Sequence, residues 1–328
     1  MTPVPAAEAP ARDLTALAHR VATHPGTRGK AAIGLVSEVF GGADWLRGPG
    51  DDGAVVETGG GRVVACGEAL WPPFVARDPW GAGFAAVLTN VNDVAAMGAE
   101  PLGIVNTVSA SEGHARAALE GMKRACALYD VPVLGGHLTS HDGEPSVSAF
   151  ALGSVDAPLS TTHVAAGQSL VVAAALDGAM RPDFPFFPAF EQRGERCAGD
   201  VRVLAALARS GAAVAAKDVS MAGLVGSLAM LLEWGTFGVE VDLDAVPAPA
   251  GVDVGDWLTC FPSFCFLLCT PAGREADAVG PFHERGLEAA VVGRIDDTGL
   301  VRLRRGDEVA TAFDLTREGV TRLTRDDR

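Results

Sequence analysis

Apolar and polar positions alternate along the first half of the chain with the periods of strands and of helices. Two apolar runs flank three successive glycines at 59–61, a pattern typical of a β-hairpin. Longer segments follow in which apolar residues recur three and four positions apart, and these predict helices. The predicted elements are strands at 54–57 and 62–66, a helix at 83–97, a strand at 102–108, a helix at 112–129, and strands at 132–134 and 146–155. This order predicts an α+β layer sandwich.

The second half has a mixed α/β pattern that begins after a stretch of small and polar residues at 156–167. Its predicted elements are strands at 170–174, 213–217, 239–243, 264–269, 289–294 and 300–304, and helices at 200–209, 221–234 and 275–285. A chain of 328 residues exceeds what one hydrophobic core usually serves, so we expect two domains. We assign an N-terminal α/β sandwich domain to 30–157 and a C-terminal α/β domain to 158–328.

The segment before residue 30 is predicted to be an arm with one short helix, and we assign it to residues 1–29. Residues 1–11 are expected to be disordered, and the apolar residues at 14, 17, 18 and 21 give the helix an inward face. We interpret 24–29 as a loop. Residues 30–40 are predicted to form another helix, with Ile33, Val36 and Phe40 turned inward.

Composition and charge narrow the classes of partner. Apolar residues make up 48% of the chain and charged residues 20%, as in globular proteins. No apolar stretch approaches the roughly 20 residues of a membrane span, and the first residues lack the apolar segment of a signal peptide. We therefore expect a cytoplasmic protein with no membrane partner. A net charge of −15 disfavours a nucleic-acid surface, because phosphate binding requires clustered lysine and arginine.

Two residue counts bear on candidate chemistry. The six cysteines show no CxxC spacing, and we expect buried thiols in a reducing compartment. The chain has 23 arginines but only three lysines, Lys30, Lys123 and Lys217. Because the two cations differ in hydration and geometry, the remaining lysines indicate positions where a compact, flexible ammonium matters. Lys30 and Lys217 both lie beside motifs rich in glycine or aspartate.

Polar residues interrupt the predicted helix at 83–97, which is otherwise apolar. Asn90 and Asp93 are three residues apart and share one face. A buried carboxylate needs a compensating partner, because burying an isolated charge is costly. A Mg²⁺ ion that carries phosphates is one such partner, since Mg²⁺ prefers one or two carboxylates with waters and phosphate oxygens. A hydrogen bond from a neighbouring loop is the other, and the helix alone does not decide between them.

Further aspartates lie at turns. Asp51 and Asp52 occupy a turn at 50–53, and Asp218 ends a predicted strand directly after Lys217. Each of these aspartates, taken alone, is more typical of a turn or a helix cap than of a ligand.

The segment Gly135-Gly136-His137 is interpreted as a loop, in which paired glycines let backbone N–H groups approach an anion. His137 and His141 have the HxxxH spacing of some zinc sites, but no helical pattern places them on one face, which disfavours zinc.

Two common nucleotide-binding motifs are excluded. The sequence has no GxxxxGK[ST] phosphate loop, so it is not a P-loop protein. Residues 81–86 loosely match GxGxxA, but the preceding segment contains prolines and is not a buried strand. We interpret these glycines as close packing where a helix begins.

Several motifs occur in an order that resembles one superfamily, which holds aminoimidazole-ribotide synthase, selenophosphate synthetase, thiamine-monophosphate kinase and the hydrogenase maturation dehydratase. The matching segments are GDDGAV at 50–55, DPWGAG at 78–83, TNVNDVAAMGAEP at 89–101, GGHLT at 135–139 and DVSMAGL at 218–224. They are similar, respectively, to the GDDAAV element, the DPxxxG lead-in, the NxSDxxAMGAxP helix, the GGHT or GGDT loop and the DxSDGL element. The resemblance spans about residues 30–295, and the segment at 89–101 is its most specific part.

The resemblance implies a homodimer whose N-terminal domains share a β-barrel, with ATP and Mg²⁺ held near the subunit interface. It also implies phosphorylation of a small-molecule substrate, catalysed by positioning and by charge neutralisation of the transferred phosphoryl group. The implied metal ligands are Asp51, Asp52, Asp93 and Asp218, the implied catalytic residues are Lys30, Asp52 and Asp218, and the implied nucleotide-binding residues are Asn90, Gly135, Gly136, His137 and Lys217.

Departures from the family patterns bear on the substrate. The cysteine that accompanies the reactive lysine of selenophosphate synthetases is missing, as are the GGEDYEL-like segment of the thiamine-phosphate kinases and the cysteine tail of the hydrogenase maturation protein. Met221 stands where the kinase has a second aspartate. We therefore expect a separate branch of the superfamily. The first hypothesis is an ATP-dependent phosphotransferase or synthetase, and the alternative is a non-catalytic nucleotide-binding dimeric subunit.

Overall fold

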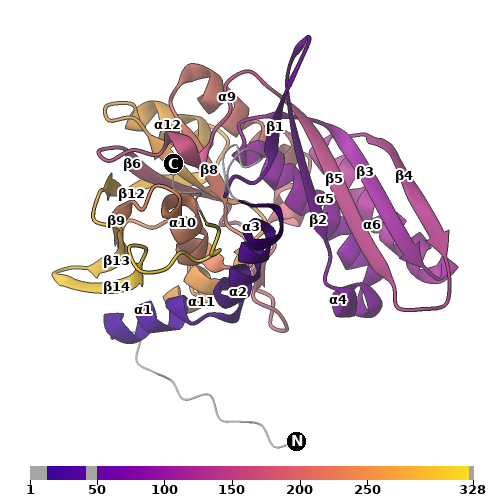
Figure 1. The fold of residues 1–328 in the computed structure, drawn as a ribbon, viewed down its shortest axis with the longest axis horizontal. Coiled ribbons are helices and arrows are strands. Elements are labelled where there is room, and N and C mark those ends of the chain that lie inside the picture. Colours follow the sequence, from indigo (N-terminus) through magenta and orange to yellow (C-terminus); the bar gives the residue numbers. More distant parts are fainter. Residues whose placement is uncertain (1–12, 42–49, 325–328) are drawn as a thin grey trace, which may run out of the picture.

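The protein has two lobes, each built on one large β-sheet (Figure 1). The structure is a computed structural model that describes residues 13–41 and 50–324. The α+β class and the division into an N-terminal and a C-terminal α/β part are confirmed. The disorder expected at residues 1–11 concerns a segment outside the described residues.

The N-terminal lobe is a five-stranded sheet with two long helices against one face. Its strands, in the spatial order β1-β2-β5-β3-β4, are β1 (Ala54–Thr58), β2 (Gly61–Ala69), β5 (Ser146–Val155), β3 (Glu100–Ala110) and β4 (Val133–Ser140). The helices are α4 (Pro72–Arg77), α5 (Pro79–Ala96) and α6 (Glu112–Tyr129). Along β5, residues buried beneath the helices alternate with exposed or half-buried residues on the opposite, open face.

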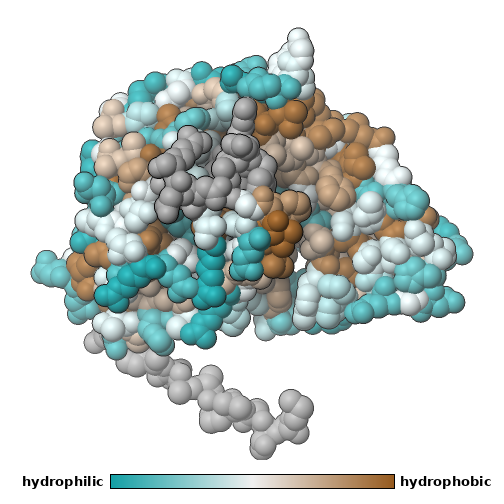
Figure 2. All heavy atoms as spheres, in the orientation of Figure 1, coloured by the Kyte–Doolittle hydropathy of each residue, from teal (hydrophilic) through white to brown (hydrophobic). Residues whose placement is uncertain are grey.

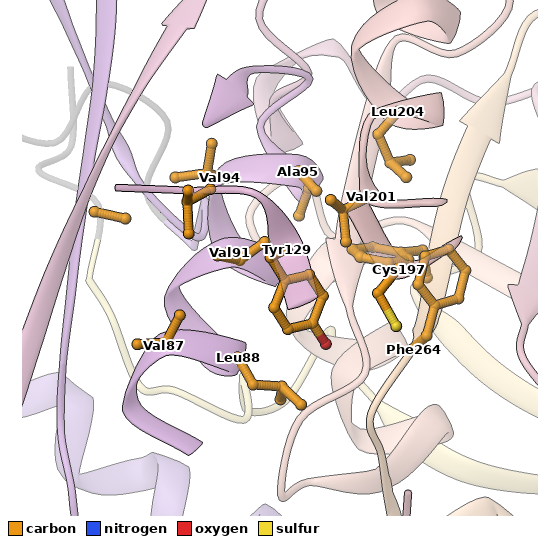
Figure 3. Close-up of a cluster of buried hydrophobic side chains, with 14 of the residues drawn as sticks. Val87, Leu88, Val91, Val94, Ala95, Tyr129, Cys197, Val201, Leu204 and Phe264 are labelled. Atoms are coloured by element: carbon orange, nitrogen blue, oxygen red, sulfur yellow. The ribbon is translucent and has the colours of Figure 1, made fainter. Parts of the chain in front are cut away.

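Helix α5 is buried around most of its circumference, which explains its nearly continuous apolar sequence. Pro79 begins the helix, and the Asp78 carboxylate accepts a hydrogen bond from the Gly81 N–H at 2.8 Å. Side chains of α5 pack with residues of the second lobe in one cluster, drawn in Figure 3, whose labelled members are Val87, Leu88, Val91, Val94, Ala95, Tyr129, Cys197, Val201, Leu204 and Phe264. The two lobes therefore share a core, and α5 runs through it.

The C-terminal lobe is a seven-stranded sheet with helices on both faces. Its strands, in spatial order, are β14 (Glu308–Asp314), β13 (Leu300–Arg305), β9 (Gly238–Asp242), β12 (Glu288–Asp296), β6 (Ser169–Ala174), β11 (Cys265–Thr270) and β8 (Ala215–Asp218). A small parallel pair joins β7 (Phe186–Phe187) to β10 (Phe261–Pro262). The helices are η2 (Thr161–His163), α7 (Phe190–Arg193), α8 (Arg196–Val201), α9 (Val203–Ser210), α10 (Gly223–Glu233), α11 (Val254–Thr259) and α12 (Glu275–His283).

Strands β6 and β11 are completely buried, because both faces of the C-terminal sheet are covered. Alternate side chains point in opposite directions. Val171 and Phe266 enter the core shared with α5, whereas Val172 and Leu267 enter a second core that includes α10 and α11.

The N-terminal arm packs against the C-terminal lobe, although the N-terminal sheet follows it in sequence. The arm consists of α1 (Leu14–Ala22), α2 (Pro25–Gly29), η1 (Lys30–Ile33) and α3 (Gly34–Phe40). The predicted helix around residues 14–21 is confirmed as α1, and its buried residues belong to the second core. The Thr27 hydroxyl donates a hydrogen bond to the Ala222 carbonyl oxygen at 3.1 Å, which fixes the arm to the loop after β8.

Two predictions for the arm are wrong. The expected loop at 24–29 contains the short helix α2, and the expected helix at 30–40 is divided into η1 and α3. Phe40 is 72% exposed rather than turned inward. Residues from the end of the chain decide the buried face: Gly34 packs against Arg322, and the Ser37 hydroxyl accepts a hydrogen bond from the Thr324 N–H at 3.2 Å.

The expectation that 135–137 forms a loop is also wrong. These residues lie within β4, an exposed edge strand that pairs in parallel with β3. Gly136 lies opposite Asn106, and a Cβ atom at this position would come within 2.5 Å of the Asn106 side-chain oxygen. The glycine is thus explained by close packing between strands. The sequence patterns also missed α4, α11, β7, β10 and β14.

Helices α5 and α6 approach each other closely at Gly121 of α6, and this contact leads to a stability prediction. A Cβ atom at Gly121 would lie 2.0 Å from the Trp80 carbonyl oxygen. We expect Gly121→Ala to lower the free energy of unfolding by about 1–3 kcal/mol, because backbone atoms cannot move aside cheaply. Gly113→Ala is the matched control in the same helix, since its Cβ would meet no atom within 4 Å. It should leave stability unchanged or raise it by up to about 1 kcal/mol. Equal melting curves for the two variants would contradict this packing.

Candidate active site

Three carboxylates meet where the two lobes join. Asp52 lies in the turn before β1, Asp93 lies on α5, and Asp218 is the last residue of β8. One ligand oxygen from each lies within 4.8 Å of those of the other two. The sequence placed all three in candidate motifs, and the fold brings them together from segments far apart in the chain.

Lys217 joins this group from β8. Its side-chain nitrogen donates a hydrogen bond to the Asp52 carboxylate and lies 4.0 Å from an Asp218 carboxylate oxygen. The other Asp52 oxygen accepts a hydrogen bond from the Asp218 N–H at 3.1 Å. Asp52 therefore links the turn of the N-terminal lobe to the end of β8 in the C-terminal lobe.

Burial controls the charges in this group. Asp93, Lys217 and Asp218 are only 7%, 4% and 4% exposed. Burial, together with the negative charges of Asp218 and Asp52, raises the pKa of Asp93 well above its usual value. Burial and the charge of Asp52 raise the pKa of Asp218 to about 7. Burial lowers the pKa of the Lys217 ammonium, but the charges of Asp52 and Asp218 outweigh this effect and raise that pKa overall. Lys217 is thus positively charged, and any further cation would stabilise the ionised form of the carboxylates.

Glu68 on β2 is a further acidic residue at this site, and the sequence analysis missed it. Although the residue as a whole is exposed, desolvation of its carboxyl group raises its pKa, while the positive charges of Lys30 and Lys217 act in the opposite direction. The available signal was strand alternation: Glu68 has the same parity as Val64 and Cys66, whose side chains face α5. The strand predicted from the sequence ends at residue 66, two residues before this glutamate, whereas β2 continues to Ala69.

Lys30 stands at the start of η1, close enough to this group for its charge to oppose the rise in the pKa of Glu68 and of Asp218. The arm holds it there through the contact of Thr27 with the loop after β8. Met221, in the same loop, is 39% exposed beside the arm. The predicted phosphate contact of Lys30 remains a prediction.

Asp51 lies outside the carboxylate group, although it adjoins Asp52. Its two oxygens accept hydrogen bonds from the Ser160 hydroxyl at 2.7 Å and the Thr161 N–H at 2.6 Å. Burial raises the pKa of Asp51 to about 6. The residue fastens the turn to η2 of the C-terminal lobe, and a metal-binding role stays a prediction that this geometry does not favour.

Asn90 and the segment 135–137 are also away from the carboxylates within one chain. The Asn90 amide donates to the carbonyl oxygens of Ala86 at 2.8 Å and Ala149 at 3.1 Å, which ties α5 to β5. Its side-chain oxygen accepts from the Cys66 thiol. Gly135, Gly136 and His137 lie three strands from β2 in the sheet order, about 14 Å at the usual strand spacing. Nucleotide binding by these residues remains a prediction.

Within residues 13–41 and 50–324, the group of side chains that could hold a metal ion includes neither His137 nor His141. Both ring nitrogens of His141 have partners, the Ser109 hydroxyl at 2.9 Å and the Gly143 N–H at 2.8 Å. All six cysteines are free, and five are buried, as expected for buried thiols. Burial raises the pKa of the Cys66 thiol, which keeps it neutral beside Asp93.

The donor set fits a hard divalent cation. The three carboxylates offer oxygen atoms only, as Mg²⁺ prefers, and their negative charges exceed the single positive charge of Lys217, which favours a further cation. Fold and site thus define a two-lobed α+β protein with a buried acidic group at the junction of its lobes.

The comparisons with known proteins agree with this architecture. Residues 50–155 match the family described as AIR synthase related protein, N-terminal domain, and residues 185–306 match its C-terminal domain. An uncharacterized protein of Synechocystis sp. is 32% identical over 280 residues, which cover 84% of this chain and 87% of that protein. The chain belongs to the AIR synthase related family.

Solved structures share the fold at low sequence identity. T. maritima PurL complexed with ADP matches with a TM-score of 0.70 and 19% identity, over 84% of this chain and 47% of that chain. AaThiL complexed with AMPPCP and TMP matches with a TM-score of 0.65 and 19% identity, over 85% and 95% of the two chains. The chain thus corresponds to about half the length of PurL. Among residues 13–41 and 50–324, no helix is long and apolar enough to cross a membrane.

The raised pKa of Asp218 predicts a pH-dependent stability in the absence of divalent ions. Its carboxyl group has a pKa of about 7 in the folded protein against 3.8 normally, so folding favours the protonated form. This contribution is complete below about pH 4 and is lost as the pH rises through about 7. In EDTA, the melting temperature of Asp218→Asn relative to that of the parent should therefore rise by a few degrees as the pH increases from 5 to 8. A constant difference across this range would contradict the assignment.

Proposed function

We propose that the protein is an ATP- and Mg²⁺-dependent phosphotransferase or synthetase that activates a small-molecule substrate by phosphorylation. The observation that carries the proposal is the buried group of Asp52, Asp93 and Asp218 at the lobe junction. Structures with the same fold hold ADP in PurL and AMPPCP in AaThiL, which supports a nucleotide as ligand. A reaction in the cytoplasm is consistent with the free cysteines.

The acidic and basic residues of this site would have different roles in the reaction. The carboxylates of Asp93 and Asp218 would hold Mg²⁺, which would supply charge neutralisation to the phosphate oxygens when bound, and Asp52 would fix the turn to β8. Lys30, carried on the arm beside Glu68, would approach the phosphate that is transferred. The arm and the shared core would exclude water from the carboxylates, since α5 is buried on both sides of Asp93. Catalysis would thus depend on positioning and charge.

Production of ADP tests this function directly. The purified protein, supplied with Mg²⁺ and ATP, is screened against sets of small-molecule acceptors in a coupled ADP assay. We expect at least one acceptor to stimulate ADP release. ATP binding without ADP release under any mixture would instead support the alternative, a non-catalytic nucleotide-binding dimeric subunit.

One aspartate inside the group and one outside it provide a matched test of the metal site. Asp93→Asn should weaken Mg²⁺-dependent AMPPCP binding by about 10-fold or more, because it removes one charged group from the site. Asp51→Asn should leave this affinity unchanged and lower stability by about 1–3 kcal/mol, because Asp51 is hydrogen-bonded to Ser160 and Thr161. Calorimetric titration and thermal melts separate the two effects. The proposed site is wrong if Asp93→Asn binds Mg²⁺ and AMPPCP as tightly as the parent.

We further propose that the N-terminal arm ends at residue 29 and the N-terminal domain at residue 157. We also propose a homodimer formed through the open face of the N-terminal sheet. Val56 and Phe150 on this face are 51% and 46% exposed, and Phe150 lies over Gly67 of the neighbouring strand. Figure 2 shows hydrophobic surface gathered over this part of the sheet. A sheet with helices on one face needs a second layer where its other face is apolar, and a second copy of the sheet provides one.

Phe150→Asp tests the dimer. A buried, unpaired carboxylate in the interface should shift the protein toward monomer, measured by light scattering across a concentration series. Phe184→Asp is the control, because Phe184 is 39% exposed but lies outside the large sheets. A parent protein that stays monomeric at all concentrations would contradict the proposal.

A further inference from the structure

Lys217 is an unusual component of a cation-binding group, because it is itself a cation. Its ammonium is buried at the lobe junction, hydrogen-bonded to Asp52 and 4.0 Å from an Asp218 oxygen. Burying an ammonium in this way is favourable only where fixed negative charges surround it. The role of Lys217 deepens the function proposed above and rests on the metal site that it includes.

The formal charges of the group are balanced by a single divalent ion. Asp52, Asp93 and Asp218 carry three negative charges when ionised, and Lys217 carries one positive charge, so two negative charges remain. One divalent ion neutralises them, whereas a second would leave the buried group with two uncompensated positive charges. The formal charges of Glu68 and Lys30, which interact electrostatically at the same site, are opposite and leave this sum unchanged.

The hydrogen bonds divide the carboxylates into two sets. Both oxygens of Asp52 are engaged, one by the Lys217 ammonium and the other by the Asp218 N–H at 3.1 Å. In the described part of the chain, no hydrogen bond reaches the carboxylate of Asp93, and the nearest cation to that of Asp218 is Lys217 at 4.0 Å. Asp93 and Asp218 therefore offer a metal ion oxygens that accept no hydrogen bond, whereas each oxygen of Asp52 already accepts one.

We infer that the Lys217 ammonium is a built-in cation that takes the place of a second divalent ion at Asp52, so that the protein itself holds only one divalent ion, between Asp93 and Asp218. Lys217 is thus a positioning residue. It holds the Asp52 carboxylate against the end of β8, and it limits the number of metal ions at the junction. Removing the lysine side chain leaves a buried, negatively charged position that a small divalent cation can fill.

Counting bound Mn²⁺ without nucleotide tests this inference. Free Mn²⁺ is measured by electron paramagnetic resonance in titrations of the parent and of Lys217→Met. Asp93→Asn provides the background from weak binding to this acidic chain. Above that background we expect one ion per chain in the parent and two in Lys217→Met. The double variant Asp52→Asn/Lys217→Met should return to one, because the new position loses its carboxylate.

A thermal melt provides a second readout that activity does not affect. Lys217→Met should melt below the parent in EDTA and recover most of the difference in millimolar Mg²⁺, while the double variant should show no such recovery. One ion in both the parent and Lys217→Met, with equal affinity, overturns the inference and leaves the proposed function intact. Two ions in the parent also overturn it, whether or not Lys217→Met folds. Binding by the parent no greater than by Asp93→Asn contradicts the inference and the proposed metal site together.

Discussion

The ion pair between Lys217 and Asp52 is the interaction on which the rest of the site depends. It connects the turn before β1 to the end of β8, and the Asp218 N–H reinforces it by donating to the same carboxylate. Removing one partner of such a buried pair typically costs about 3–5 kcal/mol, because the other charge is left without compensation. The pair therefore fixes the two lobes relative to each other at the point where the remaining carboxylates converge.

The shared core makes this convergence possible. Helix α5 packs against α6 and the N-terminal sheet on one side and against α8, α9 and the C-terminal sheet on the other. A helix in that position carries any polar residue on its lobe-facing side directly into the junction. Asp93 is the residue that the sequence places there, and its burial is what makes a cation favourable.

The sequence predicted the order of the main elements, because strong apolar periodicity is a local property. The three aspartates that meet were implied by the family resemblance of the motifs that contain them. Prediction from the sequence failed where distant segments decide the outcome. Phe40 is exposed because Arg322 and Thr324, from the end of the chain, pack against the other face of α3. Asp51 resembled its neighbour in sequence, yet Ser160 and Thr161 engage both of its oxygens.

Strand pairing explains two further differences, at residues 135–136 and at Glu68. The glycines at 135–136 suggested a loop, but parallel pairing with β3 extends β4 through them as an edge strand. Glu68 became a site residue only because β2 continues beyond the predicted end of the strand. Neither result can be read from one segment, since both depend on which strands become neighbours in the sheet.

The most direct test of the central claim is the position of the metal ion in a crystal of the protein with Mn²⁺ and AMPPCP, located by its anomalous scattering. We expect a peak coordinated by carboxylate oxygens of Asp93 and Asp218, at about the 2.0–2.1 Å typical of Mg²⁺ or slightly longer, with Asp52 still bonded to Lys217. A peak coordinated only by nucleotide phosphates and residues outside this group would contradict it.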